Sequence, residues 1–182
     1  MLARLASLLA AIHAGDGPTR SHGTVQWAVV GDALLFAGSN SLADWAHNLR
    51  AWPAQSPTGP GTVHAGWLAL ARSAWPAIKA DLPPGRAIKR VAGYSQGGAI
   101  ALLVAEVLQG VDVVVFAGPA VGCREWARRY PHGVVRCTVE PDWLAQSLLG
   151  RVHVGGHVAK SGGHNGICNH LNTLALWSAD RS

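Results

Sequence analysis

Charged residues are scarce in this chain: they account for 14% of its 182 residues, whereas hydrophobic residues account for 49%. This balance excludes a disordered chain and favours a globule with several fully buried elements. The sequence has no long basic run and no basic stretch interleaved with aromatic residues, so no nucleic-acid partner is expected. The length predicts one compact domain over residues 1–182.

Cysteines are few as well, and long hydrophobic runs are absent. The three cysteines, Cys123, Cys137 and Cys168, cannot all pair within one chain, and their spacing matches neither a zinc ribbon nor a redox CxxC motif. Free thiols are therefore expected, which favours a reducing, cytoplasmic compartment over secretion. No segment approaches the roughly 20 apolar residues of a membrane span, so no integral membrane segment is expected.

The first residues, MLARLASLLAAIHAG, combine one arginine with a short apolar run. Leucines at positions 2, 5, 8 and 9 fit one face of an amphipathic helix. A weak secretory signal is the alternative, but Ser7 interrupts the apolar run and the residues around Ala14 form a poor cleavage site. We therefore predict a helix here.

The net charge of +5 comes mostly from arginine. The densest basic group is Arg124, Arg128 and Arg129, and its spacing fits one face of a helix. We interpret the group as a solvated helix surface, with an anion-binding site as the alternative.

The order of elements predicts an α/β fold with a mostly parallel sheet, because strands and helices alternate over the second half of the chain. The run VVVF at 113–116 lacks polar alternation, which is typical of a strand covered on both faces. Residues 15–23 and 52–61 are expected to be loops. Pro76 is expected to bend or end a helix that begins near Ala65. The other expected elements are strands at 25–30, 33–36, 87–92, 111–117, 134–139 and 152–158, and helices at 41–50, 96–109, 124–130 and 170–179.

The stretch GYSQG at 93–97 follows a predicted strand and opens a predicted helix, which is the setting of a nucleophile elbow. Its glycines make room for neighbouring backbone, and Ser95 lies at the positive end of the helix dipole. A packing turn without chemistry is the alternative. As a nucleophile, Ser95 needs a histidine to take its proton and a carboxylate to orient that histidine.

The carboxylate must come from the carboxyl end of the sheet, where the loops of an open parallel sheet form a site. Asp112 begins its predicted strand and therefore lies at the wrong end. Asp142 comes just after the strand at 134–139 and is the preferred candidate, with Glu140 in reserve. The alternative for Asp142 is an ordinary turn residue.

The histidine follows the carboxylate in the usual hydrolase order, which leaves His153, His157, His164 and His170. The first two fall within a predicted strand, so His170 is preferred and His164 is held in reserve. Together with Cys168 these histidines could also ligate a metal, but their spacing matches no familiar zinc pattern. Neither a metal nor another cofactor is expected.

Several segments together resemble the class 3 lipases, which are alpha/beta-hydrolases related to the filamentous-fungal triacylglycerol lipases. The resemblance covers about residues 25–177. The matching segments are FAGSNSLADW at 36–45, VHAGW at 63–67, GYSQGG at 93–98, FAGPAVG at 116–122, RCTVEPDWL at 136–144 and NHL at 169–171.

The resemblance implies a serine carboxylester hydrolase, a lipase or esterase that works through an acyl-enzyme without a cofactor. It implies Ser95 as nucleophile, His170 as base and Asp142 as the group that orients the base. It further implies an oxyanion hole from the backbone N–H and hydroxyl of Ser39 and the backbone N–H of Gln96. The implied partner is a small-molecule ester or lipid substrate, and the protein is expected to contact a lipid interface transiently.

The chain departs from the family pattern at Ala37 and Ala120, where arginines are usual, and around Trp143 and after His170. The loss of the two arginines removes ion pairs that tie loops together. The segment after Ser39 forms a lid in the family. Residues 41–50 are a candidate lid here, and their tryptophan and leucine could equally be core.

Two other functions are compatible with the sequence. A cutinase-like esterase also carries G-Y-S-Q-G, although the cysteines do not suit its disulfide framework. The other function is that of a binding module, a hydrolase-fold protein that has lost turnover, although every catalytic position is filled.

Overall fold

The computed structural model describes residues 1–39, 52–142, 151–162 and 166–179. Its central sheet has seven strands in the order β1-β2-β3-β6-β7-β8-β9, and a second sheet pairs β4 with β5. The strands are β1 (Arg20–His22), β2 (Val25–Val30), β3 (Ala33–Phe36), β4 (Pro53–Gln55), β5 (Thr62–His64), β6 (Arg90–Tyr94), β7 (Asp112–Phe116), β8 (Val134–Glu140) and β9 (Gly156–Ser161). The helices are α1 (Leu2–Ala14), α3 (Ala65–Asp81), α4 (Gln96–Ala105), α5 (Arg124–Arg129) and α7 (Gly166–Ser178).

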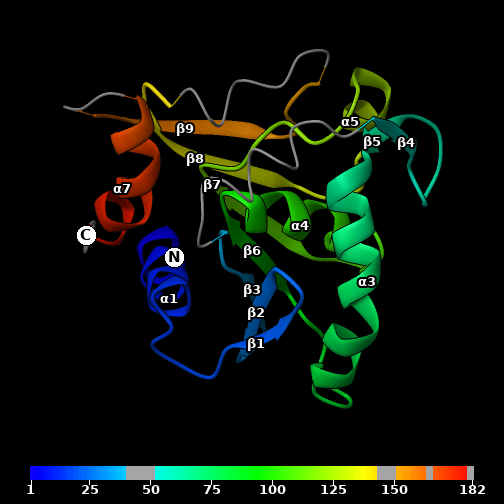
Figure 1. Ribbon diagram of the computed structural model, residues 1–182, viewed down its shortest axis with the longest axis horizontal. Coiled ribbons are helices and arrows are strands. Elements are labelled where there is room, and N and C mark those ends of the chain that lie inside the picture. Colours follow the sequence, from blue (N-terminus) through cyan, green and yellow to red (C-terminus); the bar gives the residue numbers. More distant parts are fainter. Residues whose placement is uncertain (40–51, 143–150, 163–165, 180–182) are drawn as a thin grey trace.

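The sheet is mostly parallel and is covered by helices on both faces, as the sequence predicts (Figure 1). Neighbouring strands are parallel from β3 to β9, whereas β1, β2 and β3 pair antiparallel. Helices α3 and α4 pack on one face, and α1 and α7 pack side by side on the other. The carboxyl ends of the parallel strands therefore meet along one edge of the sheet.

Strand β7 explains why the central strands carry no polar alternation. Val113 and Val115 join the core cluster beneath α3 and α4. Val114 and Phe116 join the opposite cluster beneath α1 and α7. Successive strand residues point to opposite faces, so a sheet covered on both sides requires an apolar residue at each of these positions.

The N-terminal segment is the predicted amphipathic helix. In α1 the buried residues Leu5, Leu9 and Ile12 form its inner face, and this face packs against the cluster that contains α7. The helix ends at Ala14 and is capped by Gly15, which adopts the left-handed conformation (φ 83°) that favours glycine at a helix C-terminus.

Several predicted boundaries are wrong. The last strand was expected at 152–158 but is β9, because Gly155 turns the chain in a left-handed conformation (φ 80°) and Val152 bridges to Gly122 instead. The strand expected at 87–92 is β6 and continues to Tyr94, since β3 and β7 pair with it on both sides. Helix α4 ends at Ala105, after which tighter i to i−3 hydrogen bonds take over.

Two further expectations fail because tertiary pairing overrides local sequence. The stretch 15–23 contains β1, which pairs with β2. The proline-rich stretch 52–61 contains β4, an edge strand that pairs with β5. Of the two outcomes expected at Pro76, a bend or an end of the helix, the end is wrong, since α3 continues to Asp81.

The basic group on α5 is not a uniform solvated surface. Arg124 and Arg128 are exposed, as predicted. Arg129 turns inward, and its guanidinium lies 3.3 Å from a carboxylate oxygen of Glu106, whose side chain is fully buried. The interpretation as a solvated face is therefore wrong for Arg129, because a buried carboxylate recruits it as a partner.

Glu106 is the centre of a polar network that ties the loop after β4 to α5. Its Oε1 accepts hydrogen bonds from the indole N–H of Trp126 (2.9 Å), the hydroxyl of Ser56 (3.0 Å) and the hydroxyl of Thr58. The Arg129 guanidinium also donates to the Ser56 hydroxyl at 2.6 Å. A single carboxylate therefore satisfies donors from two separate segments.

Replacing Glu106 by alanine is expected to lower the free energy of unfolding by about 3 kcal/mol, because the Arg129 charge and the Trp126 N–H lose their shared acceptor. The value lies at the low end for a broken buried pair, since the Arg129 side chain keeps 22% exposure. Urea unfolding measures this free energy in the variant and in the wild-type protein. As a control, Asp32→Asn weakens the half-exposed pair of Asp32 with Arg90 (3.0 Å) and should cost less than about 1 kcal/mol. Equal losses in the two variants would contradict the prediction.

Candidate active site

Ser95 lies at a sharp turn between β6 and α4. Its backbone adopts φ 53° and ψ −123°, a conformation that a residue with a side chain rarely takes and that costs about 1 to 3 kcal/mol. The Ser95 N–H donates to the carbonyl of Phe116 (2.9 Å), which holds the turn against the end of β7. This is the geometry of the predicted nucleophile elbow.

The two glycines of the elbow are required by the close approach of backbone. A Cβ atom on Gly93 would lie 2.2 Å from the carbonyl oxygen of Gly97, and one on Gly97 would lie 2.3 Å from that of Ala37. Only glycine fits at either position. The segment after β3, which carries Ser39, therefore packs directly against the N-terminus of α4, where Gln96 is the first residue.

His170 of α7 lies between Ser95 and Asp142. Its Nε2 is 2.9 Å from the Ser95 Oγ, and its Nδ1 is 3.0 Å from each of the two Asp142 oxygens. The side chains of His170 and Asp142 are 3% and 0% exposed. The structure thus brings together, in one buried row, three residues that are far apart in the sequence.

The contacts determine which nitrogen of His170 carries the proton. A carboxylate only accepts hydrogen bonds, so Nδ1–H donates to Asp142. In the neutral ring Nε2 is then the acceptor, and the Ser95 hydroxyl donates to it. This is the tautomer that a general base for a serine hydroxyl requires.

Asn169 holds the loop that carries Asp142, a role that the sequence analysis missed. Its side-chain amide donates to the carbonyls of Glu140 (3.0 Å) and Pro141 (3.2 Å). Because Asn169 directly precedes His170 on α7, the same helical turn positions both the base and the loop of its carboxylate. The sequence shows an amide side chain directly before His170, but nothing in it indicates which carbonyls that amide reaches.

The reserve candidates lie elsewhere or outside the described residues. The Glu140 carboxylate contacts the Thr138 hydroxyl (3.1 Å) and lies 3.6 Å from Nε2 of His157. Asp112 is the first residue of β7, at the end of that strand remote from Ser95. His164 and the candidate lid at 41–50 fall outside the described ranges.

His170 was expected at the start of the closing helix, next to a loop. It lies instead inside α7, which begins at Gly166, so its backbone is held by helical hydrogen bonds. Among the residues that the structure describes, no three His, Cys, Asp or Glu side chains gather into a group that could hold a metal ion.

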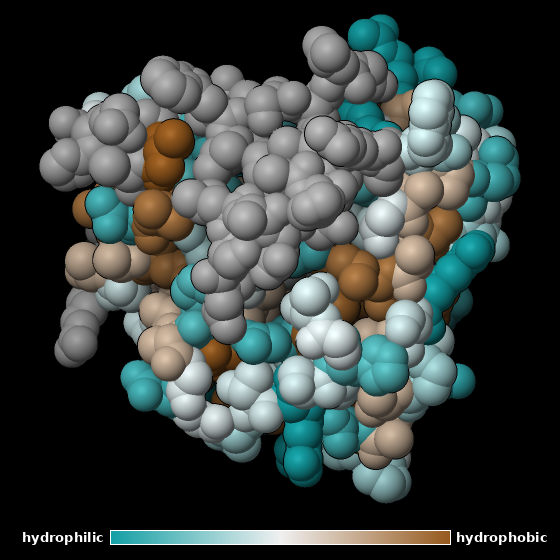
Figure 2. Space-filling model, in the orientation of Figure 1, coloured by the Kyte–Doolittle hydropathy of each residue, from teal (hydrophilic) through white to brown (hydrophobic). Residues whose placement is uncertain are grey.

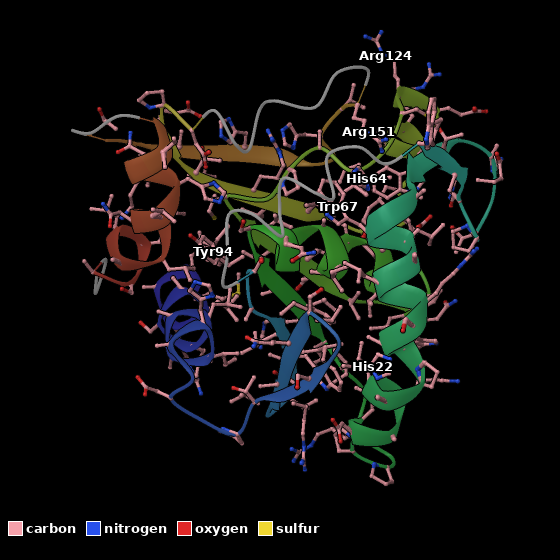
Figure 3. All side chains as sticks on the ribbon, viewed as in Figure 1. His22, His64, Trp67, Tyr94, Arg124 and Arg151 are labelled. Atoms are coloured by element: carbon pink, nitrogen blue, oxygen red, sulfur yellow. The ribbon has the colours of Figure 1, made fainter. Side chains whose placement is uncertain are left out.

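The segment VHAGW joins the site region to α3. His64 is the N-cap of α3: its Nδ1 accepts from the Trp67 N–H (3.3 Å), and the two rings stack at 3.9 Å (Figure 3). Val63 bridges to Gly122, in the segment that follows β7. Two of the segments that carry the family resemblance are therefore neighbours in space. The positions of the two missing arginines are filled by Ala37 and Ala120, both buried.

Comparison with known families decides the affiliation of the chain. The family model described as Lipase (class 3) matches residues 33–150. The chain belongs to the class 3 lipase family. A comparison with curated proteins gives no match.

Solved structures support the fold of this member of the class 3 lipase family. It is similar to the triacylglyceride lipase of Rhizomucor miehei (22% identity, TM-score 0.63, covering 78% of this chain and 64% of that one) and to lipase II of Rhizopus niveus (19%, 0.67, 80% and 66%). It is also similar to a variant of MDLA from Penicillium cyclopium (19%, 0.67, 90% and 78%). The likeness establishes the α/β-hydrolase fold. This chain spans less than two thirds of the length of the first two proteins.

Proposed function

We propose that this class 3 lipase is a serine carboxylester hydrolase that works through an acyl-enzyme. The observation that carries the proposal is the row formed by Ser95, His170 and Asp142, with 2.9 Å from the serine oxygen to the histidine and 3.0 Å from the histidine to the carboxylate. The strained backbone of Ser95 supports it, since such strain is characteristic of functional positions.

In the acylation step, the Ser95 oxygen attacks the ester carbonyl carbon while Nε2 of His170 takes the hydroxyl proton. Asp142 stabilises the imidazolium that forms. The tetrahedral intermediate then breaks its bond to the alcohol oxygen, which leaves with the proton from His170. Ser95 retains the acyl group as an ester.

Ser39 and Gln96 are the proposed donors to the oxygen that becomes negative in this step. The Gln96 N–H is available because the first N–H groups of a helix have no partner within it. Ser39 follows the segment that packs against the same helix end. Such donors stabilise the transition state more than the ester, because the charge develops only there.

Deacylation repeats these steps with water as the nucleophile. His170 takes a proton from the water as its oxygen attacks the acyl carbon, and the proton returns to Ser95 when the acid leaves. The three side chains, the ester and one water account for each proton and each leaving group. The reaction therefore needs no metal or organic cofactor.

The proposed substrates are carboxylic esters of lipids or of small molecules. An apolar surface beside the site supports contact with a lipid interface: Ile167 and Leu171, on either side of His170 in α7, are 44% and 53% exposed. Figure 2 shows hydrophobic side chains gathered over this helix. None of the helices in the described ranges is both long and apolar enough to cross a membrane.

A fluorophosphonate probe tests the proposal. Such a probe reacts with an activated serine, so the folded protein should acquire one adduct, which peptide mass spectrometry should locate on Ser95. Protein unfolded in urea should not be labelled, because the row of three side chains is then dispersed. Absence of an adduct on the folded protein would overturn the proposal in favour of a silent binding module. Turnover of p-nitrophenyl esters of rising chain length then separates a short-chain esterase from a lipase.

A further inference from the structure

Tyr94, the residue directly before Ser95, lies between the elbow and helices α1 and α7. It ends β6, is 3% exposed, and joins the core cluster formed with α1 and α7. Figure 3 shows it between the sheet and these two helices. His13 of α1 packs edge-on against the ring, with centroids 5.3 Å apart.

The Tyr94 hydroxyl bonds to the backbone of the proposed base. It donates to the carbonyl of His170 at 3.0 Å, and the two rings lie 5.8 Å apart at an angle of 33°. A carbonyl oxygen has two lone pairs, so it can accept this bond in addition to a helical one. The elbow is thus bonded to His170 twice. The Ser95 hydroxyl contacts the imidazole, and the Tyr94 hydroxyl contacts the backbone carbonyl.

The same ring supports the segment before Ser39. A Cβ atom on Gly38 would lie 2.9 Å from Cδ1 of Tyr94, so the ring packs directly against the Gly38 backbone. Burial raises the pKa of Tyr94 well above its ordinary value, and the negative charge of Asp142 raises it further. The hydroxyl therefore keeps its proton and remains a donor throughout the pH range in which esterases work.

We propose that Tyr94 is a positioning residue that fixes His170 and the Gly38–Ser39 segment relative to Ser95, an inference that rests on the proposed function. The base and the oxyanion donors come from separate elements, α7 and the segment after β3. One rigid ring in contact with both fixes their separation. Proton transfer and oxyanion stabilisation depend steeply on such distances, and a displacement of about 1 Å can cost about 100-fold in rate.

The variant Tyr94→Phe tests the inference, since it removes the hydroxyl and keeps the ring. We expect the rate of fluorophosphonate labelling and kcat for a soluble ester to fall about 10- to 100-fold with KM unchanged. The matched control is Tyr130→Phe. Tyr130 is the other tyrosine of the chain, and its hydroxyl donates to the carbonyl of Leu102 (2.6 Å) in the opposite core cluster. We expect this control to lower the melting temperature similarly and to leave the rates unchanged.

Two further measurements separate positioning from general stability. In a His170→Ala background, Tyr94→Phe should cause no additional loss, because the imidazole that the hydrogen bond positions is gone while the backbone carbonyl that accepts it is kept. Incorporation of 4-aminophenylalanine at position 94 should restore most of the rate, because its amino group is again a donor.

Three results would overturn the inference: a wild-type rate in Tyr94→Phe, an equal loss in Tyr130→Phe, or an undiminished loss in the His170→Ala background. No labelling of the wild-type protein would instead overturn the proposed function and the inference with it. That result is distinguishable because it is obtained before any variant is compared.

Discussion

Replacing Ser95 by alanine is expected to lower kcat for a soluble p-nitrophenyl ester by about a millionfold, the loss found when the nucleophile of a serine hydrolase is removed. The covalent step disappears with the hydroxyl, and water has no general base aligned at its attack position. A small residual rate above that in buffer should persist, since the proposed oxyanion donors of Ser39 and Gln96 remain. Initial rates and fluorophosphonate labelling measure the effect, and labelling should vanish.

The double variant Ser95→Ala with His170→Ala separates this loss from a folding defect. The two residues act as a unit, so the second change should add almost nothing to the first. Each single variant should unfold in urea close to the wild-type midpoint. If the two losses multiplied, Ser95 and His170 would act independently, which would contradict the 2.9 Å contact as the catalytic one.

The variant Asp142→Asn is expected to lower kcat about ten-thousandfold while KM stays nearly constant. Both Asp142 oxygens lie 3.0 Å from Nδ1 of His170, so the new amide group places N–H donors where the ring also donates. The ring then favours the tautomer with its proton on Nε2. In that tautomer Nε2 cannot accept the Ser95 proton.

Glu140→Gln is the matched control for Asp142→Asn, because it removes a carboxylate at the end of β8, two residues before Asp142. Its side chain contacts Thr138 and lies near His157. We expect an unchanged kcat. A loss comparable to that of Asp142→Asn would show that Glu140 orients the base and that the assignment of Asp142 is wrong.

The elbow could be predicted because its requirements are local. Gly93 and Gly97 stand at fixed offsets from Ser95, and an apolar strand before them and an apolar helix after them leave room for only one tight turn. The buried strand β7 was predictable for a similar reason, since four consecutive apolar residues permit few other structures. Both signals lie within short stretches of chain.

The partners of the site were only partly predictable. Asp142 was favoured because a strand direction assigns each loop to one end of the sheet, and the structure places it against His170. Sequence spacing could not reveal that Asn169 clamps the Asp142 loop, or that the Tyr94 hydroxyl reaches α7. These contacts join residues that are far apart in the chain, and no local pattern encodes their distance.

The misjudged Arg129 shows the same limit. Its helical spacing beside Arg124 and Arg128 indicated a solvated face, because a charge without a visible partner normally stays in water. The partner, Glu106, directly follows α4 in a different part of the chain, and its side chain is fully buried beside Ser56 and Trp126. The energy of a buried charge depends on those neighbours and not on its own surroundings in the sequence.

The sequence by itself determined the alternation of strands and helices, the elbow at Ser95 and the amphipathic first helix, because backbone sterics and hydrophobic periodicity act over a few residues. Only the tertiary structure decided which histidine faces that serine, which side chains hold its loop, and which arginine is drawn inward. Those outcomes depend on distances between elements, and such distances arise only when the two faces of the sheet are packed and buried polar groups pair across the packed elements.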